Sequence, residues 1–227
     1  MLIIADKRIP DAAKNRLRDF GMLYELSTNT IVDDAISGHP DLFICQVDNS
    51  LIISPQAPSS LIDDLASRNL KFKMGNKTVE KEYPGCVTYN AVITEKFLIH
   101  HLQITDDAIL EAANELIHVH VNQGFTRCNL LPVGDGFITS DSGIYKKLQL
   151  LDIDVLLTSA DQILLPGYRN GCFGGCCGIY EDHIFILGKL SNSKNGNSIR
   201  EFIEAQNYKI VELYNGPLFD GGSIFFI

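Results

Sequence analysis

The chain has 227 residues, of which 45% are hydrophobic and 21% charged, a balance typical of a globular protein. Its formal net charge of −9 disfavours binding to nucleic acid or to anionic membranes, because both require a basic patch, and it is compatible with a cationic small-molecule ligand. No run reaches the roughly 18–20 apolar residues of a membrane span, and the N-terminal segment lacks the pattern of a signal peptide. We therefore expect a cytoplasmic protein whose six cysteines are reduced.

The same order of elements recurs along the chain. Apolar runs with strand character begin at residues 2, 51, 97, 137 and 184, at intervals of 40 to 49 residues. An amphipathic helix follows each run, and these helices are predicted over residues 10–20, 58–69, 105–115, 142–152 and 197–207. Each helix is followed by another strand, and these strands are predicted over residues 22–27, 70–75, 117–121, 154–159 and 208–214.

Each of the five apolar runs is also preceded by a strand. Four of these first strands are predicted over 41–47, 87–93, 128–134 and 176–181, whereas the fifth lies at the end of the chain, over 221–227. A ring closed by pairing the two chain ends explains this split unit, and closure removes exposed sheet edges. The sequence therefore predicts an α/β fold in which five pseudo-symmetric ββαβ units form a ring, as one domain over residues 1–227. An open α/β sheet with accidental spacing is the alternative.

The ring of ββαβ units and the terminal segment Phe219–Ile227, which reads FDGGSIFFI, resemble the guanidino-modifying enzyme fold, also called the pentein or α/β-propeller fold. The segments SGHPD (37–41), NQGFTRCN (122–129) and LLPGYRNGCFGGCCG (164–178) look like signatures of an uncharacterised bacterial branch of it. The resemblance implies a ring-axis site where a Cys in the last strand attacks a guanidinium carbon. It also implies a His that acts as general acid and base, and carboxylates that hold the guanidinium.

The sequence departs from the family pattern at both catalytic positions. The nucleophile position falls on Phe225 or Phe226, and the strand expected to carry the His reads Thr126–Asn129. The standard activity is therefore not carried over, and a non-catalytic translation initiation factor with the same fold shows that a ring of this kind also serves in binding.

Cys176 and Cys177 are the candidate nucleophiles that remain. They follow two glycines just as the family's Cys follows the terminal Gly-Gly, and only one of two adjacent strand residues can face the axis. The alternative is that both are small buried apolar residues. A zinc site that uses them together with Cys172 lacks a second Cys/His pair at ligand spacing, so neither a metal nor a cofactor is predicted.

Four aspartates are candidates for binding a cationic group. Asp6 and Asp141 each follow a central strand, while Asp41 and Asp220 precede first strands. Equivalent positions in a ring converge at one end of its axis, so these carboxylates could form an acidic pocket. Ordinary turn formation and helix capping are the alternative.

Four further polar residues complete the predicted site, namely His39, Asn90, Arg127 and Asn129. His39, in a loop near Asp41, is a candidate acid or base, and an exposed loop histidine is the alternative; His101 is a second candidate. Arg127, at the start of a predicted strand beside Asn129, could bind a ligand carboxylate or pair with an aspartate.

The sequence thus predicts a small-molecule site at the ring axis. Its activity would be thiol-dependent hydrolysis or transfer at the C–N bond of a guanidino or amino-acid-like ligand, and a non-catalytic binding or interaction module is the alternative. The sequence decides neither between them nor the oligomeric state.

Overall fold

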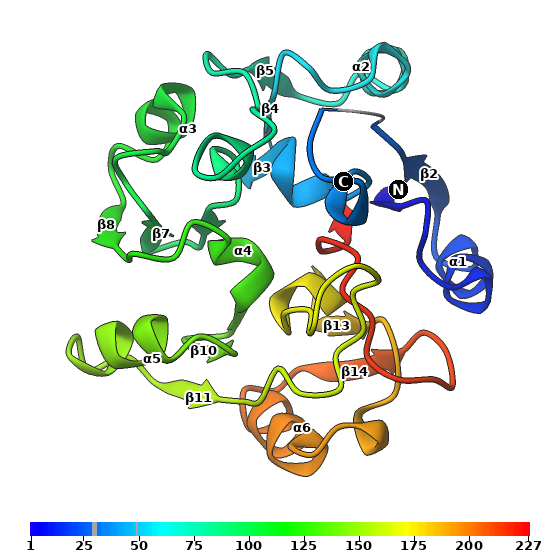
Figure 1. Ribbon diagram of the computed structural model, residues 1–227, viewed down its shortest axis with the longest axis vertical. Helices are drawn as coiled ribbons and strands as arrows, with labels where there is room; N and C mark the ends of the chain where they lie inside the picture. The colour runs from blue at the N-terminus through cyan, green and yellow to red at the C-terminus, as the bar shows by residue number, and fades with distance from the viewer. Residues whose placement is uncertain (29–30, 49) are drawn as a thin grey trace.

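The fold is a ring of five small sheets around a central axis (Figure 1). The computed structural model describes residues 1–28, 31–48 and 50–227. This part of the chain forms five three-stranded sheets, which follow one another around the ring in sequence order, with the long helices on the outside (Figure 1). The predicted five-unit ring is confirmed.

Each sheet has the same topology. Its central strand pairs antiparallel with an inner strand and parallel with an outer strand, and a helix connects the central strand to the outer one. In the order inner, central and outer, the strands are β15 (Phe225–Phe226), β1 (Leu2–Asp6) and β2 (Met22–Leu26); β3 (Ile44–Val47), β4 (Ser50–Ile53) and β5 (Phe72–Met74); β6 (Val92–Ile93), β7 (Phe97–His100) and β8 (Ile117–His120); β9 (Leu130–Val133), β10 (Gly136–Thr139) and β11 (Val155–Leu157); and β12 (Cys177–Tyr180), β13 (His183–Ile186) and β14 (Lys209–Glu212). The connecting helices are α1 (Asp11–Arg18), α2 (Ser59–Ser67), α3 (Asp107–Ala112), α5 (Ser142–Gln149) and α6 (Gly196–Ala205).

The two ends of the chain close the ring. The strand β15 pairs antiparallel with β1, with Ile3 opposite Phe226 and Ile4 opposite Phe225. The termini accordingly lie close together in Figure 1. Because every residue of β1 is buried, this closing sheet is part of the core, and the predicted split unit is confirmed.

The helices bury one apolar side against the sheets. In α1, for example, Ala13 and Leu17 are fully buried, whereas the charged residues face outward. Burial of a leucine side chain contributes about 2 kcal/mol to stability. Within the described residues, none of the helices has the length and apolar character needed to cross a membrane.

The inner strands differ from the prediction in where they begin. Short helical turns precede four of them, namely η2 (Pro40–Leu42), η3 (Gly85–Val87), α4 (Thr126–Asn129) and η4 (Gly174–Cys176). The prediction of strands from residues 41, 87, 128 and 176 was therefore wrong for their first residues. Proline at the start of η2 and glycine in η3 and η4 favour turns over strands. Arg127, predicted at a strand start, lies in α4.

Candidate functional site at the ring axis

The inner strands bring two different features to the axis. Residues just before these strands meet at one end of the axis, and residues near the strand ends meet at the other. The parallel bridge between Gly178 and Ile224 shows that β12 and β15 run in the same direction. The first end is closed and polar, and the second end holds a cavity.

The closed end is a buried group of polar side chains, which we call the polar cluster. Each of its members is between 0% and 2% exposed. The members are His39, Asp41, Asn90, Cys128, Asp220 and Ser223. They come from four of the five units, so only the folded ring assembles them.

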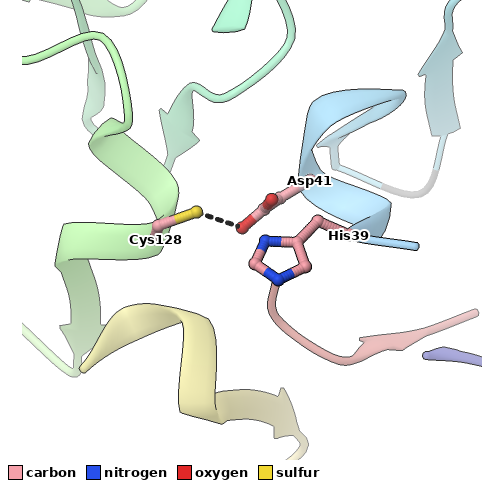
Figure 2. A group of neighbouring side chains, drawn as sticks. All are labelled: His39, Asp41 and Cys128. Carbon is pink, nitrogen blue, oxygen red and sulfur yellow. Dashed lines mark hydrogen bonds between the residues drawn. The ribbon is translucent and has the colours of Figure 1, made fainter. Parts of the chain in front are cut away.

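Asp41 lies at the centre of the polar cluster. Its Oδ2 accepts a hydrogen bond from the thiol of Cys128 and another from the hydroxyl of Ser223, each at 3.0 Å. Figure 2 shows the thiol of Cys128, on α4, pointing toward this carboxylate, with the ring of His39 beside it. Asn90 joins the same group, since its Nδ2 lies 3.4 Å from Cys128 Sγ and donates to the backbone carbonyl of Asp41 at 3.2 Å.

The glycines of the sequence motifs allow this close assembly. The carboxylate of Asp220 accepts hydrogen bonds from the backbone N–H of Gly222 at 3.0 Å and of Cys172 at 2.8 Å. A Cβ atom at Gly175 would overlap the Asp220 carboxylate. One at Gly222, whose φ of +65° also favours glycine, would overlap His39.

Burial determines the protonation of the polar cluster. Burial raises the pKa of Asp41 and of Asp220, and it raises the pKa of Cys128 well above the ordinary thiol value. Burial also lowers the pKa of His39, against the opposing effects of Asp220 and Asp6. In the absence of a bound cation, each of these groups is therefore shifted toward its neutral form.

The other end of the axis holds a cavity of about 630 Å³, which we call the axial cavity. Residues near the ends of all five inner strands line it, namely Gln46, Ile93, Pro132, Ile179 and Phe225. The volume lies within the range of about 300–1,000 Å³ that is typical of small-molecule sites. The exposed acidic side chains of Asp48 and Glu95 also line it.

Arg127 connects the two ends of the axis. It lines the axial cavity, and it also interacts electrostatically with Asp41 and Cys128 of the polar cluster. Burial lowers the pKa of Arg127, and the nearby Asp41 opposes that effect. Its Nη1 is buried without a hydrogen-bonding partner, and among the described residues its guanidinium forms neither an ion pair nor a side-chain hydrogen bond.

The two candidate nucleophiles are core residues of one unit. Cys176 and Cys177 are both fully buried, and their thiols donate to the backbone carbonyls of Cys172 and Phe173, each at 3.3 Å. Burial raises the pKa of both thiols far above the ordinary value, so they are protonated at neutral pH. Neither belongs to the described lining of the axial cavity.

Three other predicted site residues have local partners. Asp6 is buried, forms an ion pair with Arg8 and lies close enough to raise the pKa of His39. Asp141 caps α5 and accepts hydrogen bonds from the backbone N–H groups of Gly143 and Ile144. Helix capping was the alternative to a cation-binding role for this aspartate. The Asn129 side chain accepts from the hydroxyl of Ser140 at 3.1 Å and donates to a backbone carbonyl of the preceding turn.

The structure thus brings His39, Asp41, Asn90 and Asp220 together, with Asp6 beside them and Arg127 between them and the cavity. It also adds two residues that were not predicted as site members, Cys128 and Ser223. Both lie just before inner strands, as Asp41 and Asp220 do. The aspartates were selected because they precede inner strands. A search of the same positions for thiols and hydroxyls would have found Cys128 and Ser223.

The comparisons with known proteins concern nearly the whole chain. The sequence profile of a family of unknown function, DUF6873, matches residues 4–225. No curated protein sequence matches the chain. Solved structures do match it in fold.

Three of these structures illustrate the likeness. A mutant of the dimethylarginine dimethylaminohydrolase DDAH from Pseudomonas aeruginosa, complexed with citrulline, has 9% identity and a TM-score of 0.54, covering 93% of this chain and 91% of its own. The amidinotransferase SxtG of Microseira wollei has 10% identity and a TM-score of 0.52, and the match covers 92% of this chain and 87% of SxtG. A substrate-bound mutant of C. jejuni agmatine deiminase has 10% identity and a TM-score of 0.56, and the match covers 96% of this chain and 90% of the deiminase. The chain has the pentein fold, which confirms the resemblance, and identities this low show the fold alone.

Proposed function

We propose that the axial cavity of this protein, which belongs to the DUF6873 family of unknown function, binds a small molecule. The molecule has a carboxylate at one end and a cationic amino or guanidino group at the other. The binding is non-covalent. The single observation that carries the proposal is Arg127, a guanidinium at the axis whose buried Nη1 has no partner among the residues that the structure describes.

An unpaired guanidinium in this position is best explained by a ligand that pairs with it. Arg127 as a whole is partly exposed, but its Nη1 is buried, and a desolvated cation destabilises the fold unless a counter-charge accompanies it, because the protein interior solvates charge poorly. Arginine remains protonated even when burial lowers its pKa. Its planar fork binds a carboxylate through two parallel hydrogen bonds.

The rest of the lining fits the remainder of such a molecule. Asp48 and Glu95 are exposed acidic side chains and can attract a cationic group at the mouth of the axial cavity. Pro132, Ile179 and Phe225 provide apolar surface for an alkyl chain between the two charges. The net charge of −9 adds a general attraction for cations.

Thiol-dependent hydrolysis or transfer at a C–N bond is the rival function. It would need a thiolate beside the ligand. The resemblance places the nucleophile at Phe225 or Phe226, and Phe225 lines the axial cavity with an unreactive ring. The raised pKa values of Cys176 and Cys177 likewise favour binding over catalysis.

A calorimetric titration of the wild-type protein with three matched probes tests the proposal. L-Arginine carries both charged ends, agmatine lacks the carboxylate, and L-norvaline lacks the guanidinium. We expect L-arginine to bind one per chain, and each truncated probe to bind at least about tenfold more weakly, because a hydrogen bond to a charged group contributes about 1.5–3 kcal/mol. Agmatine binding as tightly as L-arginine would overturn the role of Arg127, and the absence of L-arginine binding would overturn the ligand class.

A further inference from the structure

We propose that the polar cluster is a binding site for a divalent metal ion of the zinc class, held by a ring nitrogen of His39, a carboxylate oxygen of Asp41 and the sulfur of Cys128. One ligand atom from each of these residues lies within 4.8 Å of the other two. Figure 2 shows the three side chains converging, His39 from the residue just before η2, Asp41 from η2 and Cys128 from α4. This inference is independent of the ligand proposed for the axial cavity.

The hydrogen bonding of the polar cluster is incomplete where the ion would lie. His39 is 1% exposed, yet among the described residues neither ring nitrogen has a partner of normal hydrogen-bond geometry. The Oδ1 atom of Asp41, a fully buried residue, also has no partner within the described part of the chain. Buried polar atoms without partners are rare, and each destabilises the fold by about 1–3 kcal/mol. A cation bound to His39 and to Asp41 Oδ1 satisfies both residues.

The three ligands match the charge and preference of zinc. A thiolate, a carboxylate and a neutral imidazole balance a divalent cation, so the occupied site is neutral overall and suits a buried position. Sulfur and nitrogen ligands favour zinc-class ions over magnesium or calcium. On binding, the S–H bond of Cys128 breaks, a metal–sulfur bond forms and the proton leaves to solvent, with no change of oxidation state.

Cobalt titration of untagged, chelator-treated protein tests the site. We expect wild-type protein to bind one Co²⁺ per chain with a thiolate-to-cobalt charge-transfer band, which Zn²⁺ then abolishes by displacement. Cys128→Ser should lose this band. Cys86→Ser, which changes a buried thiol outside the polar cluster, should keep it.

Two results would overturn the inference. One is wild-type protein that shows no stoichiometric Co²⁺ binding, and the other is a charge-transfer band that survives in Cys128→Ser. If that variant fails to fold, X-ray absorption of zinc-loaded wild-type protein decides the question. A first shell with one sulfur and nitrogen or oxygen ligands supports the site, whereas a shell with no sulfur or with several sulfurs contradicts it.

Discussion

The thiol of Cys128 donates to Oδ2 of Asp41 at 3.0 Å, although 87 residues separate them in sequence. The hydroxyl of Ser223, 182 residues from Asp41, donates to the same oxygen. One carboxylate thus connects three units of the ring. We expect Asp41→Ala to lower the free energy of unfolding by about 2–4 kcal/mol, because two buried donors lose their acceptor. Asp41→Asn, which keeps one oxygen acceptor, should have a smaller effect.

Urea unfolding in the presence of a chelator measures this difference without a contribution from metal. Asp161→Ala, which changes an exposed aspartate, is the control and should shift stability by less than about 0.5 kcal/mol. An Asp41→Ala protein as stable as this control would show that the carboxylate does not hold the units together.

Arg127 should reduce stability in the free protein. We expect Arg127→Met to raise the free energy of unfolding by about 1–3 kcal/mol, because it replaces a partly buried guanidinium, which has no ion-pair or hydrogen-bonding partner among the described residues, with an apolar side chain. The matched control is Arg169→Met, at an exposed position, which should leave stability unchanged. A marked loss of stability in Arg127→Met would mean that the guanidinium has a structural partner.

The thiols should be inert in the native state. Burial raises the pKa of all six cysteines, so alkylation at pH 8 should modify them only after the protein is denatured. Mass spectrometry of alkylated peptides assigns the sites. Rapid labelling of Cys176 or Cys177 in the native protein, with an apparent pKa below the usual thiol value, would instead support the hypothesis that one of these two cysteines is a nucleophile.

His100 should make stability depend on pH. Its ring is buried between the hydroxyl of Thr105, at 2.8 Å, and the carbonyl of Gly124, at 3.0 Å, and burial lowers its pKa from 6.5 to about 4. The carbonyl of Gly124 can only accept, so Nε2 of the neutral ring carries the proton. The unfolded chain takes up a proton first as the pH falls. The stability contributed by neutral His100 is therefore complete above pH 6.5 and is lost as the pH falls through about 4.

The expected loss is about 3 kcal/mol between these limits. Urea unfolding of wild-type protein at pH 7 and at pH 4 measures it against His100→Gln, which lacks this contribution and should change less. His118→Gln, at an exposed histidine, should behave like wild type. Equal pH dependence in wild type and His100→Gln would show that His100 is not the responsible group.

The ring could be predicted because its signal is repeated. Five intervals of similar length, each with the same order of elements, are hard to reconcile with another fold, and the unpaired terminal strand required closure. The starts of the inner strands could not be read in this way. Whether residues such as Asp41 and Arg127 continue a strand or form a helical turn depends on partners across the axis, and periodicity within a short segment does not contain that information.

The site was predictable in part for the same reason. Asp41 and Asp220 were selected as equivalent positions before inner strands, and they do lie in one cluster. Asp141 occupies a position equivalent to Asp6, yet its carboxylate caps a helix, because the choice between capping and facing the axis is made by the local turn. The axial cavity was not predictable in its details, since its lining comes from five segments spread over the chain.

Calorimetric titration of L-arginine into wild-type, Arg127→Met and Arg169→Met proteins tests the central claim most directly. Our account predicts one binding event per chain in wild type and in Arg169→Met. In Arg127→Met the affinity should fall at least about tenfold, because the carboxylate of the ligand loses its charged partner. Equal affinity for all three proteins would contradict the claim that Arg127 binds the ligand.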